Sequence, residues 1–163
     1  MTLRPTWRRS WRRRRMSKAG ERVLSMLLWS WGGTVYFLLE VIWKLVRGEP
    51  ERISWTMLVL AILLCIPVER CGAELPWTCP LWLQALSCAA LVTAVELGAG
   101  LVLNVWLGLG IWDYSGLRWN LFGQICPQFS LIWWALCMAF IPIFDWMWYS
   151  IEGGERPYYQ MGW

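Results

Sequence analysis

The chain has 163 residues, 58% of them hydrophobic, and its 15 Lys and Arg outnumber its 11 Asp and Glu, while histidine is absent. This apolar share exceeds that of soluble domains, and the lack of histidine excludes His-containing zinc, haem and acid–base sites. The six cysteines form no CxxC pair, so we predict unpaired, membrane-buried thiols, no metal site and no cofactor.

Residues 1–22 hold nine of the fifteen basic residues and predict a basic cytoplasmic arm. A basic run that directly precedes an apolar span is typical of a topology signal that contacts anionic lipid. We expect the headgroup contacts from Arg12, Arg13, Arg14 and Arg15. Two weaker alternatives stay open, which are an organelle transit peptide and a nucleic-acid-binding run.

Four apolar runs follow at about 23–46, 53–68, 80–106 and 128–150, and together they form a transmembrane domain over 23–150. A run of about 20 residues can cross a bilayer as a helix, and lipid does not tolerate the unpaired backbone of open strands. The second run is short and would cross a thin region or lean on its neighbours. The predicted fold class is an all-α integral membrane protein, a bundle of four transmembrane helices.

The basic arm also predicts the topology. Basic residues stay on the cytoplasmic side, and an even number of spans returns the chain to the side on which it began. We therefore expect a multi-pass protein of the cell membrane whose N-terminus and short tail, 151–163, are both cytoplasmic. Most of the 16 tryptophans lie near predicted helix ends, as in an interfacial belt. This belt includes Trp148, and Asp145 beside it is expected to be interfacial.

Two glutamates lie inside predicted helices, Glu40 in the first and Glu96 in the third. A charged carboxylate at the bilayer centre costs at least about 2.5 kcal/mol, so each needs a partner, water or a proton. Each glutamate belongs to a polar stripe with helical spacing that also holds a glycine for close packing. The stripes contain Tyr36, Glu40 and Lys44 on the first helix and Thr93, Glu96 and Asn104 on the third. We interpret them as an intramembrane polar site, although the same residues could equally serve only to fix helix pairing.

The connector 107–127 contains IWDYSGLRWNLFGQIC, in which polar residues alternate with aromatic ones. Its low charge and its Trp, Leu and Ile content argue against disorder, and a structureless connector of this length is unusual in a compact protein. We predict an ordered extracytoplasmic connector between the third and fourth helices. In it, Asp113 would close an Asx turn, while Trp112, Trp119 and Phe122 would lie at headgroup level.

Several of these segments resemble the CmpB-like family of small membrane proteins, labelled "Putative ABC-transporter type IV". The resemblance covers roughly residues 25–148 and rests on WDYS, WNLFGQIC, GGTVYFLLEVIWKLVRG and PLWLQALSCAALVTAVELGAGLVLN. It implies a transporter component, such as a permease subunit, but supplies no catalytic or substrate-binding residues. The connector positions that match the family are Trp112, Asp113, Tyr114, Ser115, Asn120, Gly123 and Gln124. Because the sequence has no Walker A motif, any ATP hydrolysis would belong to a partner.

We therefore predict a membrane-embedded component of a small-molecule or ion transport system, and not an enzyme. Partners would be the bilayer itself and either further copies of the chain or other membrane and ATPase subunits. The alternatives are a structural or regulatory protein whose polar residues only specify helix assembly, and a lipid-acting enzyme that uses Glu and Asp chemistry alone.

Overall fold

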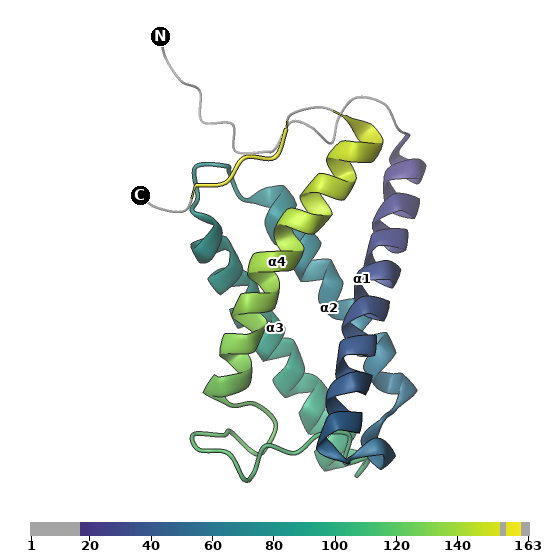
Figure 1. The fold of residues 1–163 in the computed structure, drawn as a ribbon, viewed down its shortest axis with the longest axis vertical. Helices are drawn as coiled ribbons and strands as arrows, with labels where there is room; N and C mark the ends of the chain where they lie inside the picture. Colours follow the sequence, from purple (N-terminus) through teal and green to yellow (C-terminus); the bar gives the residue numbers. More distant parts are fainter. Residues whose placement is uncertain (1–16, 154–155, 161–163) are drawn as a thin grey trace.

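A computed structural model describes residues 17–153 and 156–160 and shows, over this part of the chain, a bundle of four long helices (Figure 1). The helices are α1 (Lys18–Arg47), α2 (Trp55–Glu74), α3 (Leu81–Gly100) and α4 (Pro127–Glu152). Helix α3 continues as the π-helix η3 (Leu101–Trp106), and the short 3-10 helix η2 (Pro50–Arg52) precedes α2. Within the described residues each long helix, with η3 counted as part of α3, is long and apolar enough to cross a membrane. The predicted all-α membrane fold is confirmed.

The ends of α1 and the start of α2 follow from capping residues. Ser17 accepts a hydrogen bond from the backbone N–H of Gly20 at 3.2 Å and so begins α1. Gly48, with φ of 72°, ends the same helix in the left-handed conformation that glycine adopts most readily. Ser54 then caps α2 by accepting from the N–H of Thr56 at 3.3 Å. The turn between the two helices is therefore encoded locally.

Helix α2 runs past the apolar segment that marks it in the sequence. Hydropathy places its end near residue 68, whereas the helix continues through Pro67 and ends at Glu74. The physical reason is that Glu69 turns inward and is only 3% exposed, since other helices supply its hydrogen-bond donors. A polar residue therefore does not end the helix here.

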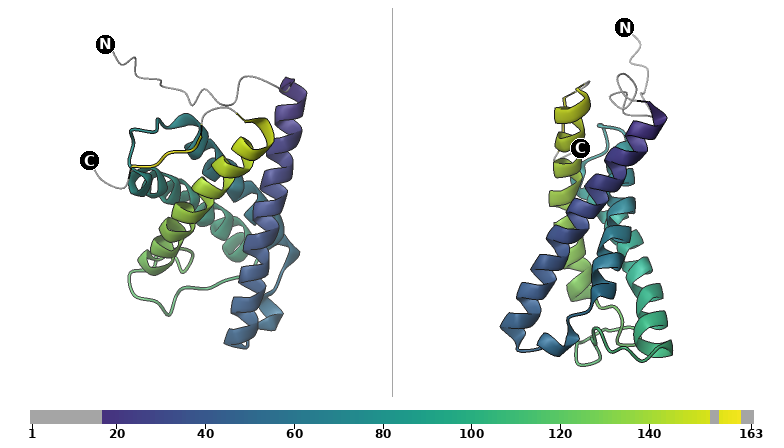
Figure 2. Two further views of the ribbon diagram at one scale, coloured as in Figure 1. Left: turned by 45° about the horizontal axis from the view of Figure 1, so that its top comes forward. Right: turned by 90° about the vertical axis from the view of Figure 1, so that its right-hand side faces the viewer.

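The bundle has two distinct ends. The first turn of α1 and the last turn of α4 lie at one end, called here the terminal end, whereas residues 48–54 and 107–126 lie at the other, the connector end (Figures 1 and 2). At the terminal end, the N–H of Leu81 donates to the carbonyl of Gln160 at 3.0 Å, and the rings of Trp77 and Tyr159 meet edge to face. The segment 156–160 thus packs onto the start of α3.

Helix α2 is the centre of the bundle, because it packs against α1, α3 and α4, while α3 also packs against α4. The contact between α1 and α2 depends on Gly33. A Cβ atom at this position would lie 2.6 Å from the backbone nitrogen of Ile62, a distance that real side chains do not reach. The absence of a side chain therefore lets the two backbones approach closely.

Candidate functional site

Glu40 lies in the second half of α1 beside two polar residues of the same helix. Its Oε1 lies 3.2 Å from Nζ of Lys44, which is one helical turn further along, and its Oε2 accepts from the hydroxyl of Tyr36 at 3.4 Å. Lys44 is 4% exposed and donates in addition to the carbonyls of Arg52 at 2.8 Å and Ile111 at 3.2 Å. The ammonium therefore ties α1 to both segments of the connector end.

Glu96 lies on α3 and is 6% exposed. Its Oε2 accepts from the indole N–H of Trp133 on α4 at 2.8 Å, and its Oε1 accepts from the hydroxyl of Tyr114 at 3.2 Å. The ring of Trp133 stacks on Tyr36, with centroids 4.9 Å apart. Neutral donors therefore hold this carboxylate, and one aromatic stack joins its surroundings to those of Glu40.

Glu40 and Glu96 line the same small cavity in the interior of the bundle. The cavity has a volume of about 10 Å³, and its wall also includes Tyr36, Tyr114 and Trp133. A buried water needs a cavity of roughly 10–15 Å³, so the inner cavity has room for about one water molecule. The two glutamates of the predicted polar site thus face a common space.

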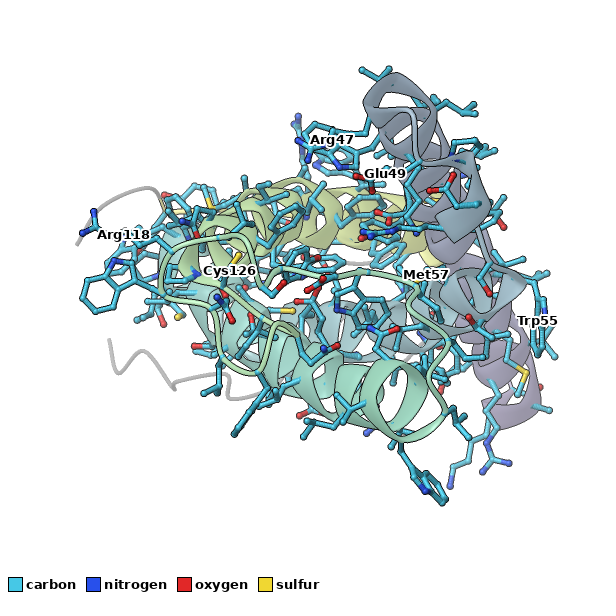
Figure 3. The ribbon with its side chains drawn as sticks, turned by 90° about the horizontal axis from the view of Figure 1, so that it is seen from below. Arg47, Glu49, Trp55, Met57, Arg118 and Cys126 are labelled. Atoms are coloured by element: carbon cyan, nitrogen blue, oxygen red, sulfur yellow. The ribbon has the colours of Figure 1, made fainter. Side chains whose placement is uncertain are left out.

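A larger cavity of about 300 Å³ lies next to the inner one at the connector end and is called here the vestibule. The two cavities share Glu40, Trp112 and Tyr114 in their walls. The charged side chains that line the vestibule are Lys44, Arg47, Arg52, Glu40, Glu49 and Asp113. Figure 3 views this end and shows Arg47 and Glu49 close to the end of α1, while Arg118 projects at the outer edge of the connector. A charged space thus adjoins the inner cavity.

The connector between η3 and α4 is folded by its own polar residues. The N–H of Ser115 donates to Oδ1 of Asp113 at 2.8 Å, which closes an Asx turn. Asn120 donates to the carbonyl of Leu117 at 2.7 Å and accepts from the N–H of Gly123 at 2.9 Å. The hydrogen bonds from Ser115 hold the pKa of Asp113 below its usual value. These bonds explain why this stretch combines polar with aromatic residues.

Asn104 and Gln124 attach the connector to the bundle. The side chain of Asn104 donates to Oε1 of Gln124 at 2.8 Å and accepts from the N–H of Ile111 at 2.7 Å, while Trp112 donates to the carbonyl of Gln124 at 3.0 Å. Tyr114 follows and reaches Glu96, and burial together with the nearby Glu96 carboxylate raises the pKa of the Tyr114 hydroxyl. The connector thus forms part of the wall of the inner cavity.

Two residues of the stripe predicted on the third helix lie outside the inner cavity. Thr93 donates to the hydroxyl of Ser130 on α4 at 3.3 Å, and Asn104 holds the connector as described. The inner cavity is lined by neither of them. Asn104 and Gly100, one turn earlier, face the same Oε1 atom of Gln124, which a Cβ at Gly100 would approach to 2.5 Å.

Three residues that were expected at the membrane interface are buried. Trp112 is 6% exposed, Trp148 is 1% exposed, and Asp145 is 2% exposed and accepts from the hydroxyl of Tyr159 at 2.6 Å. All three side chains contact the protein core, which position along the sequence does not reveal. Trp119 and Phe122, by contrast, are exposed, and both have positive φ angles.

Sequence reasoning missed a further buried carboxylate, Glu69, in the terminal half of the bundle. It accepts hydrogen bonds from Ser25 at 3.1 Å, from the indole of Trp29 at 3.2 Å and from the indole of Trp148 at 2.9 Å. The available signal was the spacing of Ser25 and Trp29, which places a hydroxyl and an indole on one face of α1.

Two further predictions concern lipid contact by the basic arm and the absence of a metal site. The basic residues Arg12, Arg13, Arg14 and Arg15 lie outside the described residues. Within the described ranges, no group of three or more His, Cys, Asp and Glu side chains is placed to hold a metal ion.

Comparison with known proteins gives one match. The sequence profile of the family described as "Putative ABC-transporter type IV" matches residues 55–154, which span α2, α3, the connector and α4. No curated protein and no solved structure matches the chain. The matched segment contains Glu69, Glu96 and the connector motif, whereas α1, with Glu40 and Lys44, precedes it.

Proposed function

The chain belongs to the Putative ABC-transporter type IV family, and from this membership we propose that it is a membrane-embedded component of an ion or small-molecule transport system. The observation that carries the proposal is the inner cavity, where Glu40 and Glu96 from two different helices face one space beside the vestibule. Ionisable residues inside a membrane are costly, and those that face a cavity usually mark an ion or substrate pathway.

The size and charge of the inner cavity favour a proton or a small cation. Its volume of about 10 Å³ admits little more than one water molecule. Lys44 compensates the charge of Glu40, whereas the hydrogen-bond partners of Glu96 are the neutral Tyr114 and Trp133. The Glu96 carboxylate thus has neutral partners only, and this arrangement is suited to binding a proton or a monovalent cation. Any larger substrate would need helix movement or a partner subunit.

We place the terminal end in the cytoplasm and the connector end outside, because the basic arm precedes α1. In this orientation the vestibule opens to the extracytoplasmic side of the cell membrane, and Arg12 to Arg15 contact anionic lipid on the inner side. Further copies of the chain, or membrane and ATPase subunits, would complete the pathway and supply the energy.

The test is ion flux in proteoliposomes that hold the full chain together with any subunits that co-purify in mild detergent. An internal pH dye reports proton movement, and sodium or potassium gradients test the monovalent cations. We expect Glu96→Gln to lower the flux at least about tenfold, since a neutral amide neither releases a proton nor attracts a cation. Glu74→Gln is the matched control, because this side chain is 70% exposed at the terminal end. Flux that survives Glu96→Gln would refute the proposed site.

A purely structural role is the second candidate, and one observation favours it. Both oxygens of Glu96 already accept hydrogen bonds from the protein, as buried polar groups that specify helix packing do. Under this alternative, wild-type proteoliposomes carry no flux above empty vesicles, and Glu96→Leu lowers the yield of folded protein.

A further inference from the structure

An apolar groove of about 380 Å³ lies between α1 and α4, next to the vestibule. It extends from Tyr36 to Val46 on α1 and from Phe129 to Leu136 on α4. Leu39, Ile42 and Ile132 line it and are 48%, 58% and 47% exposed, so the groove is open on its outer side. In a membrane this open side faces acyl chains.

The groove has the length of one membrane leaflet. The ten residue steps from Tyr36 to Val46 correspond to about 15 Å of helix. The hydrocarbon core of a bilayer is about 30 Å thick, so each leaflet contributes roughly half of it. One acyl chain entering from the connector end would therefore extend along the whole groove.

The groove is continuous with the vestibule at its polar end. Both are lined by Glu40, Trp43 and Phe129, and the guanidinium carbon of Arg47 lies 5.8 Å from the centre of the Trp43 ring. Each space has a volume within the range of about 300–1,000 Å³ that is usual for ligand sites. Together they form one amphipathic site with a charged end and an apolar end.

The charges of the vestibule indicate which headgroup fits. Three basic and three acidic side chains line it, so its lining is neutral overall. Lys44 pairs with Glu40 at 3.2 Å and Arg52 pairs with Glu49 at 3.5 Å, which leaves one basic group, Arg47, and one acidic group, Asp113, to meet a ligand. Arg47 is suited to phosphate, because a guanidinium presents paired donors to its oxygens. Asp113 is suited to an ammonium group that can donate hydrogen bonds. An anionic headgroup would bring no cation to Asp113, and a choline group has no N–H to donate.

We propose that this site binds one phosphatidylethanolamine molecule, with its headgroup in the vestibule and one acyl chain in the groove between α1 and α4. The phosphate lies toward Arg47, and the ammonium toward Asp113. This inference goes beyond the proposed function, because lipid binding at this site does not require that the protein transports an ion.

Native mass spectrometry tests the headgroup. The full chain is delipidated in mild detergent and offered equal amounts of phosphatidylethanolamine, phosphatidylcholine and phosphatidylglycerol. We expect one bound ethanolamine lipid per chain and weaker retention of the other two. Arg47→Gln should lower its retention about tenfold, the effect of losing one charge-assisted hydrogen bond. Arg70→Gln is the control, because that side chain is 65% exposed at the terminal end. Equal retention of the three lipids, or an unchanged Arg47→Gln variant, would overturn the proposal.

A second pair of variants tests the groove. Ile132→Trp places a large ring inside the groove, whereas Leu131→Trp changes the adjacent residue, which is 64% exposed and does not line the groove. A phosphatidylethanolamine with a photoreactive acyl chain should label the 127–140 region of the wild type and of Leu131→Trp, but not of Ile132→Trp. Circular dichroism checks that each variant is folded. Labelling that persists in folded Ile132→Trp contradicts the proposed site. Wild-type protein that retains the lipid but carries no ion flux would refute only the transport proposal.

Discussion

Two buried carboxylates lie in opposite halves of the bundle, and their surroundings differ. Glu69, in the terminal half, accepts from the hydroxyl of Ser25 and from the indoles of Trp29 and Trp148. None of the cavities described above is lined by Glu69. Its oxygens are thus surrounded by donors that α1 and α4 hold in place.

Glu96, in the connector half, accepts from Tyr114 and Trp133 but also faces a cavity that it shares with Glu40. Burial and hydrogen bonding alone therefore do not distinguish an acid that organises packing from one that handles an ion. The distinguishing features are the adjacent space and the second carboxylate, which in the proposed transport function would give a proton or a cation a place to bind.

The largest expected effect is on stability, at Glu69. Glu69→Leu removes the acceptor of one buried and two partly buried donors, each of which costs about 1–3 kcal/mol when it is stranded. We expect the free energy of unfolding in mild detergent to fall by about 3 kcal/mol or more. Glu74→Leu, at a side chain that is 70% exposed, should change it little. A loss at Glu69 no greater than that of the control would show that these donors find other partners.

An isosteric change at both acids sharpens the comparison. In Glu69→Gln the new NH₂ group faces an indole N–H in either orientation, because Trp148 donates to one carboxylate oxygen and Trp29 to the other, and an indole N–H cannot accept a hydrogen bond. In Glu96→Gln the amide can accept from Trp133 and donate to the hydroxyl of Tyr114, which does accept.

Chemical unfolding should therefore show a loss of about 1–3 kcal/mol for Glu69→Gln and of less than about 1 kcal/mol for Glu96→Gln. Flux should show the opposite order, with Glu96→Gln the more damaging variant. If the two substitutions are equally destabilising, the proposed difference between the two halves is incorrect.

Gly33→Ala tests whether the two halves are coupled through α1. Gly33 lies between the residues of α1 that contact Glu69 and those that surround Glu40, and its added Cβ would press on the backbone of Ile62. We expect a loss of about 1–3 kcal/mol in unfolding free energy, because backbone atoms must move apart. Gly98→Ala is the matched control on α3, where an added Cβ meets nothing within 4 Å. Equal unfolding energies for the two variants would mean that α1 and α2 separate without cost.

The smallest effect is expected at the exposed Asp113. The pKa of its carboxyl is held below the ordinary value of 3.8 by hydrogen bonds from Ser115. The contribution of the ionised carboxylate to stability is therefore complete above about pH 4 and is lost as the pH falls through the lower folded value.

Asp113→Asn keeps an acceptor oxygen but does not titrate, so the unfolding midpoints of wild type and variant should differ less at pH 3 than at pH 6. Asp113→Ala should cost less than about 1 kcal/mol at pH 6, because water can satisfy the exposed N–H of Ser115. A difference between wild type and Asp113→Asn that grows in acid would contradict the lowered pKa.

The fold was predictable because length and apolarity suffice to identify helices that span a bilayer. The end of α2 was not, since hydropathy treats Glu69 as the end of a run although indoles from α1 and α4 satisfy it. Trp112 and Trp148 show the same gap, because their burial depends on the rotation of each segment against its neighbours.

Parts of the site could also be read from spacing. An interval of four residues on α1 is enough to bring Lys44 to Glu40. On α3 the spacing of Gly100 and Asn104 brings both to Gln124, but the sequence does not reveal that this connector side chain lies there. The role of Tyr114 as a partner of Glu96 also depends on how the connector folds back, which is a tertiary property.

Lys44 imposes a condition on anything that binds in the vestibule. An ammonium group has three protons, and those of Lys44 are directed to Glu40, to the carbonyl of Arg52 and to the carbonyl of Ile111. A ligand anion can therefore recruit this nitrogen only by replacing one of these partners. Replacing either carbonyl would remove a contact between α1 and the connector end, so recognition of the ligand and loosening of the connector end would be a single event.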